Sequence, residues 1–195
     1  ETREEATREG LPSEGVEILT MYSVPANLEI AEPREVRELR MRLVGAQFGR
    51  LEVSDERQKL SGDTLLVSAL FPSSRRARRA DPESFGEDLK PTPLIQSDDN
   101  KIRALVDSVL SPEEPVWSKV TELVAWVYHN VEKRPTMSIP SAVEVLEHRR
   151  GDCNEHAVLF AALARASGVP TRLCGGLVCL NGRFYYHAWS KVWVG

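Results

Sequence analysis

Residues 151–157 of the chain read GDCNEHA, and an apolar run, VLFAALA, follows at 158–164. Asp152 can act as the N-cap of a helix, because its carboxylate can accept hydrogen bonds from the free amides of the first turn. Glu155 lies three residues later and completes a capping-box pattern. The apolar run has almost no polar side, so we expect a helix that is buried on most faces and that ends at Gly168-Val169-Pro170.

Cys153 falls in the first turn of this predicted helix. The helix dipole and the unpaired amides favour a negative charge there, and cysteines in such positions have pKa values about one to several units below about 8.5. We therefore predict an easily ionised thiol whose own backbone amide can donate to an oxyanion. The alternative interpretation is that Cys153 is an inert core residue, since cysteine is among the most buried residue types.

The sequence changes period after Pro170. Residues 171–180 are typical of a strand, Asn181-Gly182 is a hairpin turn signal, and residues 183–194 are typical of the returning strand. Alternation places His187 on one face of the second strand, with Tyr185 and Trp189, and Ala188 on the other. If the helix that begins at Cys153 packs on the face of His187, thiol and imidazole can meet. That pair would be suited to acyl transfer.

These segments resemble the bacterial branch of the transglutaminase-like superfamily, which is related in architecture to papain-like cysteine proteases. The matching motifs are GDCNEHA at 151–157, LFAALARASGVPTR at 159–172 and FYYHAW at 184–189. The resemblance implies that Cys153 is the nucleophile and His187 the general base. It also implies an aspartate on the next strand that orients the imidazole. The chain ends at Gly195 without a counterpart, so we expect a C-terminally incomplete domain.

The predicted fold class is α+β, with a transglutaminase-like or papain-like core of helices packed on an antiparallel sheet. A β-rich N-terminal domain precedes it. We place the accessory domain and its linker at residues 1–95 and the catalytic domain at residues 96–195. The segments that support this division are strand patterns at 16–22, 39–43 and 64–71, a loop or linker at 73–93, and helix patterns at 98–110 and 112–131, the second capped by Ser111.

Composition limits the partners of the chain. Its formal net charge is −4, and its one basic cluster, Arg75 to Arg79, falls in a predicted loop without interleaved aromatic residues, so we expect no nucleic-acid binding. No apolar run is long enough for a membrane span. The cysteine and histidine spacings lack the paired pattern of zinc sites, and no acidic calcium loop is present, so we expect no metal and no cofactor.

The leading hypothesis is an enzyme that acts on amide bonds of proteins or peptides through a thioester on Cys153. Peptidase, deamidase and cross-linking chemistry all remain open, and the fragment is expected to be impaired if it lacks the aspartate. The alternative is a non-catalytic protein-binding or scaffold module that keeps the fold. The open edge after Val194 favours self-association. The chain begins at Glu1 rather than Met, so the compartment stays open, with a periplasmic or secreted location as one option.

Overall fold

The computed structural model describes residues 23–27, 30, 32, 35–49, 51–69, 85–136 and 140–194. These residues form two units. One holds the described residues of 27–76, and the other holds those of 1–26 and 77–195. The strand pattern predicted at 16–22 and the basic cluster at 75–79 lie outside the described residues.

The smaller unit is a three-stranded antiparallel sheet with the order β2-β4-β3. Its strands are β2 (Glu38–Arg42), β3 (Gln58–Ser61) and β4 (Thr64–Ser68). Leu39 pairs with Val67 and Met41 with Leu65, so the two strand patterns found in the sequence are confirmed and lie side by side. The sequence did not predict β3, because its four residues contain a single apolar side chain, Leu60.

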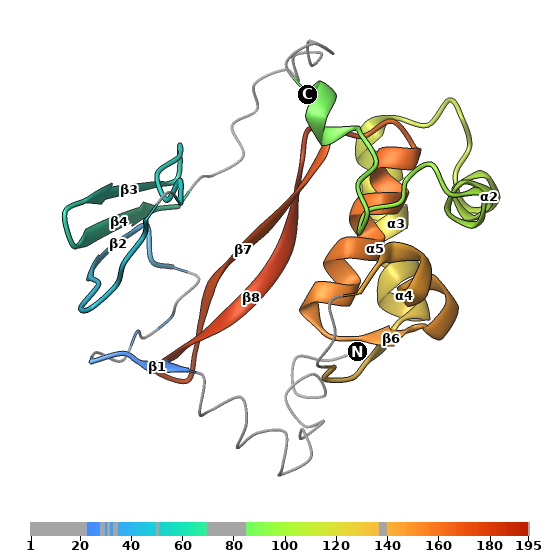
Figure 1. Ribbon diagram of the computed structural model, residues 1–195. Coiled ribbons are helices and arrows are strands. Elements are labelled where there is room, and N and C mark those ends of the chain that lie inside the picture. Colours follow the sequence, from blue (N-terminus) through green and yellow to red (C-terminus); the bar gives the residue numbers. More distant parts are fainter. Residues whose placement is uncertain are drawn as a thin grey trace. The chain divides into compact units, whose positions relative to one another are not determined.

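The larger unit combines helices with a second antiparallel sheet, which confirms the predicted α+β class (Figure 1). The sheet has the order β1-β8-β7, and a separate pair of short parallel strands, β5 and β6, precedes α5. The elements of this unit are β1 (Val24–Pro25), η1 (Gly86–Asp88), α2 (Asn100–Val109), α3 (Val116–Asn130), β5 (Glu132–Lys133), α4 (Ala142–His148), β6 (Arg150–Gly151), α5 (Cys153–Ala166), β7 (Thr171–Leu180) and β8 (Arg183–Val192).

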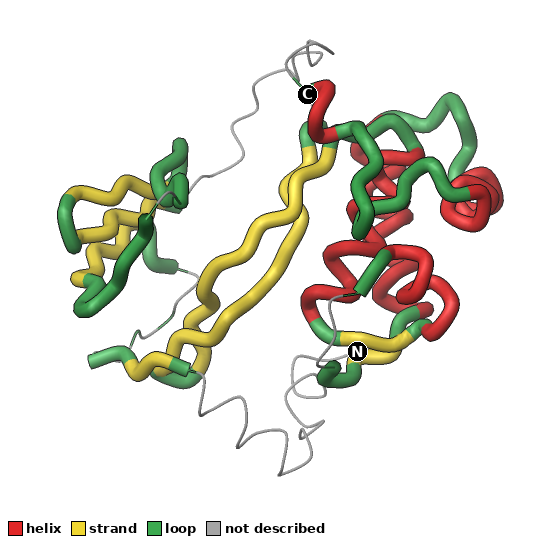
Figure 2. The backbone as a smooth tube through the Cα atoms, viewed as in Figure 1, coloured by secondary structure: helices red, strands yellow, loops and turns green. Residues whose placement is uncertain are grey.

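Helix α5 lies at the centre of the larger unit. It contacts α2, α3 and α4 on one side and β7 and β8 on the other. Figure 2 shows the helices together on one side of the hairpin of β7 and β8. Leu159, Leu163 and the alanines between them are fully buried. Full burial of one leucine side chain stabilises a fold by about 1.5–3 kcal/mol, so this helix anchors the unit. The prediction of a helix buried on most faces is confirmed.

Helix α3 begins later than the sequence suggested. We expected a start at Pro112 with Ser111 as the cap, but α3 begins at Val116, with Pro115 in the N-cap position. Residues 111–114 instead form a turn, in which the Glu114 amide donates to the Ser111 carbonyl and the Ser111 amide donates to the Glu114 carboxylate. The Ser-Pro signal therefore marks a turn that precedes the helix.

Residues 85–95 pack within the larger unit, although the sequence-based division placed them with the N-terminal domain. The ring of Phe85 stacks on Trp193 with 4.7 Å between centroids, and Asp88 forms an ion pair with Arg172 at 2.9 Å. The buried guanidinium of Arg165 donates to the carbonyls of Lys90 and Thr171. The assignment of an accessory and a catalytic domain remains a prediction.

The hairpin of β7 and β8 follows the predicted boundaries closely. Asn181 and Gly182 both have positive φ, 50° and 71°, which is the requirement of a two-residue type I′ turn. This turn fixes the register, in which Leu180 pairs with Arg183 and Gly175 with Ala188. On the other edge of β8, β1 pairs with only Arg183 and Phe184. In the described part of the chain, no helix is long and apolar enough to cross a membrane.

Candidate active site at the start of α5

Cys153 is the first residue of α5, directly after its N-cap, Asp152. The Asp152 carboxylate accepts a hydrogen bond from the Asn154 amide at 2.9 Å, and the Asp152 amide donates to the Glu155 carboxylate at 2.9 Å. This reciprocal capping box is the one predicted from the sequence. It holds the backbone on both sides of Cys153 in place, so the position of the thiol is set by local structure.

Gly151 is required by the packing of Glu155. A Cβ atom at position 151 would lie 2.1 Å from the Cβ of Glu155, a distance that no packed pair of side chains adopts. Glu155 is only 2% exposed, and its carboxylate also accepts a hydrogen bond from the Thr136 hydroxyl. The glycine in GDC therefore makes room for a buried carboxylate that braces the first turn of α5.

The two carboxyl groups of this turn differ in acidity. Burial raises the pKa of Asp152 to about 6, and its hydrogen bond with Glu155 contributes to the rise. Burial opposes ionisation of Glu155 as well, but hydrogen bonds from Asp152 and Thr136 hold the pKa of Glu155 below its ordinary value. Glu155 is therefore the ionised partner, and Asp152 gains its negative charge only as the pH rises through about 6.

The pKa of the Cys153 thiol is raised, which makes our prediction of a lowered pKa wrong for this geometry. Burial is the largest cause, and the nearby Asp152 carboxylate adds to the rise. The backbone of Ala188, and the amides of Cys153 and Asn154 at the helix end, act in the opposite direction. The helix terminus favours the thiolate as expected, but the loss of solvent outweighs it.

The structure does not bring His187 to Cys153. Helix α5 packs on the face of β8 that carries Tyr186, Ala188 and Ser190. The Tyr186 hydroxyl donates to Asn154 Oδ1 at 3.0 Å, and the Ser190 hydroxyl donates to the Ala157 carbonyl at 3.1 Å.

Strand alternation puts His187 on the opposite face, where it is exposed and its ring lies 6.3 Å from that of Trp189. The thiol and the imidazole could meet only if α5 packed on the face of His187, and in this arrangement it packs on the other face. The physical reason is packing: Leu173 and Val192 share the face of Ala188 and reach the core beside α5.

His156 lies one turn after Cys153 on the same helix. Its Nδ1 donates a hydrogen bond to the Asp152 carbonyl oxygen at 2.6 Å. Nε2 is buried and has no hydrogen-bond partner among the described residues. The hydrogen bond from Nδ1 ties the His156 side chain to the N-cap residue at the start of α5.

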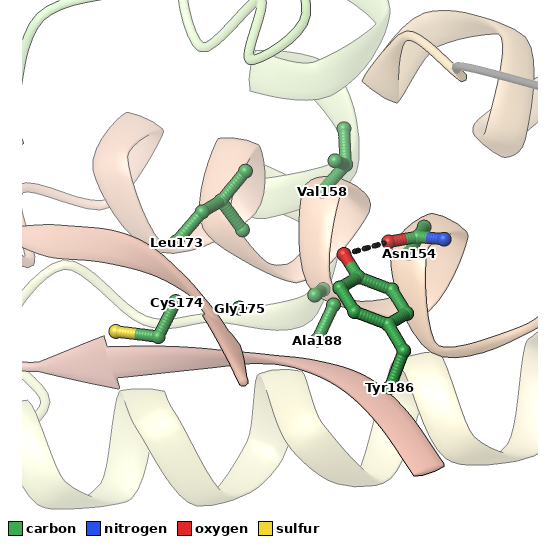
Figure 3. A pocket seen from close by; sticks show the side chains of 8 residues that line it. Asn154, Val158, Leu173, Cys174, Gly175, Tyr186 and Ala188 are labelled. Carbon is green, nitrogen blue, oxygen red and sulfur yellow. Dashed lines mark hydrogen bonds between the residues drawn. The ribbon is translucent and has the colours of Figure 1, made fainter. Parts of the chain in front are cut away.

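A cavity of about 150 Å³ lies between α5 and the hairpin, and Asn154 in its wall directly follows Cys153 in the chain (Figure 3). Sequence reasoning missed it. The signal that could have found it is the pairing of two small residues, Gly175 and Ala188, at one level of the hairpin. The lining residues are Asn154, Ala157 and Val158 from α5, Leu173, Cys174 and Gly175 from β7, and Tyr186 and Ala188 from β8.

The other cysteines do not extend the site. Cys153, Cys174 and Cys179 are all free thiols. Across the described ranges, no three His, Cys, Asp or Glu side chains gather as a group that could hold a metal ion.

Comparison with known proteins supports the resemblance for the C-terminal part of the chain. Residues 103–195 match the family model of the transglutaminase-like superfamily. The resemblance found in the sequence is thereby confirmed, and this part of the chain carries a transglutaminase-like core. No curated protein sequence matches the chain.

Two solved proteins share the fold. A candidate cysteine protease from Cytophaga hutchinsonii has a TM-score of 0.54 and 24% identity, over 71% of this chain and 57% of its own. The periplasmic domain of TgpA from Pseudomonas aeruginosa has a TM-score of 0.53 and 20% identity, over 88% of this chain and 70% of its own. Its ethylmercury-bound form gives 0.51 and 22%, over 80% and 68%. The chain thus spans little more than half of the candidate protease, and the likeness concerns the fold.

Proposed function

We propose that this chain is the core of a thiol enzyme that acts on amide bonds of proteins or peptides, with Cys153 as the nucleophile. The observation that carries the proposal is the position of Cys153 at the amino end of the central helix. Backbone groups of Ala188, Cys153 and Asn154 act there to favour the thiolate. The same amides are suited to stabilise the oxyanion that forms when the sulfur attacks a carbonyl carbon.

In the proposed reaction the Cys153 sulfur bonds to the carbonyl carbon of a carboxamide or peptide, and the carbon–nitrogen bond then breaks. The leaving ammonia or amine takes a proton, and a thioester remains on Cys153. Water then releases a carboxylic acid and regenerates the thiol, or an amine acceptor forms a new amide. The first outcome is peptidase or deamidase chemistry, and the second is cross-linking.

The resemblance assigns the proton transfers to His187, and this role requires a rearrangement of β8. His187 directly precedes Ala188, whose backbone interacts with the thiol, but its side chain leaves from the other face of the strand. We propose that in the active arrangement this imidazole reaches the thiol past the edge of β8, while Tyr186 and Ala188 keep their places beside α5. An imidazolium next to the sulfur would then lower the pKa of Cys153 and oppose the effect of burial.

Amide turnover tests this function. The assay measures ammonia release from a glutaminyl peptide, hydroxamate formation when hydroxylamine is the acceptor, and new amino groups from a peptide substrate. Cys153→Ala should abolish whichever product forms, whereas the matched variant Cys179→Ala should retain it. Turnover that survives in Cys153→Ala contradicts the proposal.

A thiol-alkylation profile tests the partner of Cys153. The rate of iodoacetamide modification at Cys153 is followed against pH in the parent chain and in His187→Ala. If the imidazole pairs with the thiolate, the inflection of the parent chain lies at lower pH than that of the variant. Superimposed profiles would remove His187 from the proposed mechanism.

A second candidate function is a non-catalytic protein-binding module that retains the fold. The observation that favours it is the combination described above, in which His187 faces away from α5 and burial raises the pKa of the thiol. This function predicts no amide turnover in the parent chain and binding of a protein partner that is indifferent to Cys153→Ala.

We further propose a periplasmic or secreted location, supported by the fold shared with the periplasmic domain of TgpA. Fractionation of cells that express the natural protein would test it. Self-association through the edge of β8 also remains a proposal. Only Arg183 and Phe184 of that strand pair with β1, and light scattering at several protein concentrations would test it.

A further inference from the structure

We propose that the cavity between α5 and the hairpin is a specificity subsite that takes a small aliphatic side chain adjacent to the reacting amide of the substrate. The inference rests on the proposed function, because it is the proximity to Cys153 that makes the cavity relevant to a substrate. It assigns the selection of side-chain size to Gly175 and Tyr186.

Two residues of the cavity wall, one on α5 and one on β8, lie next to the reacting sulfur. Asn154, in its wall, directly follows Cys153 on α5, and Ala188, also in its wall, places its backbone against the thiol. A peptide with its carbonyl carbon at the sulfur therefore has a neighbouring side chain within reach of the cavity. A pocket at this place would position the reacting amide, which is how binding of remote groups contributes to turnover.

The size and lining define the ligand. A cavity of about 150 Å³ is large enough for a benzene-sized molecule, and its lining combines hydrocarbon with the polar groups of Asn154 and Tyr186. Ala157, Val158, Leu173 and Ala188 contribute hydrocarbon to the walls. A side chain of about three or four carbons, such as that of valine or leucine, fits this volume, whereas an indole exceeds it.

Tyr186 forms the rim of the cavity (Figure 3). Its hydroxyl is fixed by Asn154 Oδ1 at 3.0 Å, while 58% of the residue stays exposed to solvent. Opposite the ring, a Cβ added to Gly175 would meet Tyr186 Cε2 at 3.6 Å and the hydroxyl at 3.7 Å. These are ordinary contact distances, so Gly175→Ala fits without a backbone shift and narrows the space beneath the ring.

Binding of small amides tests the inference without any thiol chemistry. In a Cys153→Ala background, the N-acetyl amides of glycine, alanine, valine and tryptophan are titrated, and the methyl NMR signals of Ala157 and Val158 are followed. The valine amide should bind about 10-fold more tightly than the glycine and tryptophan amides. Gly175→Ala should weaken the valine amide by about 10-fold.

Two further variants complete the experiment. Val178→Ala, on the opposite face of β7, is the matched control and should leave all four affinities unchanged. Tyr186→Ala should open the rim and allow the tryptophan amide to bind, which keeps the test informative if Gly175→Ala does not fold.

Equal affinities for all four amides, methyl shifts elsewhere in the protein, absence of binding, or no effect of either cavity variant would each overturn the inference. The outcome is separable from that of the proposed function. The binding test is done without the Cys153 thiol, and the amide-turnover assay does not depend on side-chain size.

Discussion

The amino end of α5 and the middle of β8 supply the two halves of the candidate active site. The two regions differ in how firmly their surroundings hold the candidate residue. At α5, the residues around Cys153 are fixed by a capping box, a buried Glu155 and a central helix. At β8, the strand contacts α5 through one face only, and His187 lies exposed on the other. The position of the nucleophile follows from local interactions, whereas the position of the base depends on which face of a hairpin meets a helix.

This difference explains why the position of Cys153 is fixed by local structure while that of His187 is not. A helix surrounded on most sides has one possible orientation in its core. A strand has two possible orientations, because either of its faces can meet the helix. The face whose side chains pack better against the helix is the one that does so. Here Leu173, Val192 and the small Ala188 favour the face that excludes His187.

The largest expected effect concerns the stability of the two regions. Leu163→Ala should lower the free energy of unfolding by about 3 kcal/mol, because the fully buried side chain leaves a cavity in the core. Leu177→Ala, on the hairpin, should lower it by less than about 0.5 kcal/mol, because that side chain is 59% exposed. Urea denaturation of both variants would measure the contrast, and equal losses would contradict it.

The brace beneath the nucleophile should be almost as sensitive. Gly151→Ala should cost about 2 kcal/mol or more, because the new methyl group overlaps the Glu155 side chain and must displace the capping box. Gly86→Ala is the control, since a Cβ there meets no atom within 4 Å. If both variants have the same urea midpoint as the parent chain, the Glu155 side chain does not pack against position 151.

The contact between the regions can be weakened through a single hydroxyl. Ser190→Ala removes the hydrogen bond to the Ala157 carbonyl and should lower the free energy of unfolding by about 1 kcal/mol. A variant of the opposite face, His187→Ala, should have a smaller effect, because that residue is exposed and points away from α5. The reverse order of the two losses would mean that α5 packs on the face of His187.

The smallest change in stability, and a clear change in reactivity, is expected for Asp152→Asn. Asparagine caps a helix as well as aspartate does, so the helix should persist. The charge of Asp152 raises the pKa of Cys153 and is present above about pH 6, so its removal should move the alkylation inflection of Cys153 to lower pH. Glu147→Gln, on the surface of α4, is the charge-matched control. An unchanged inflection would show that burial alone raises the thiol pKa.

Much of the fold could be predicted from the sequence. The start of α5, its capping box and the hairpin with its Asn181-Gly182 turn follow from short-range rules on caps, turns and period. The short strands β3, β5 and β6 could not be predicted, because they carry little hydrophobic pattern and exist through pairing with distant residues.

The sequence supplies candidate residues for the site but does not fix how they are arranged. The resemblance marks Cys153 and His187, yet a period of two shows only that His187 and Ala188 face opposite sides. It does not show which side meets the helix. The acidity of the thiol also escaped prediction, because burial depends on the hairpin that covers the helix end.

The two-residue turn at Asn181-Gly182 has a consequence for how hairpins of this kind diversify. The turn fixes which side chains of β8 lie on each face. Even-numbered residues from Phe184 to Val192 lie on the α5 side, and odd-numbered ones lie on the opposite side. One inserted residue between the turn and Ala188 would reverse that assignment and present the imidazole to the helix in place of the methyl group. In evolutionary terms, a single codon gained or lost in this hairpin would exchange the set of side chains that meets the helix, without a change to any residue of the helix.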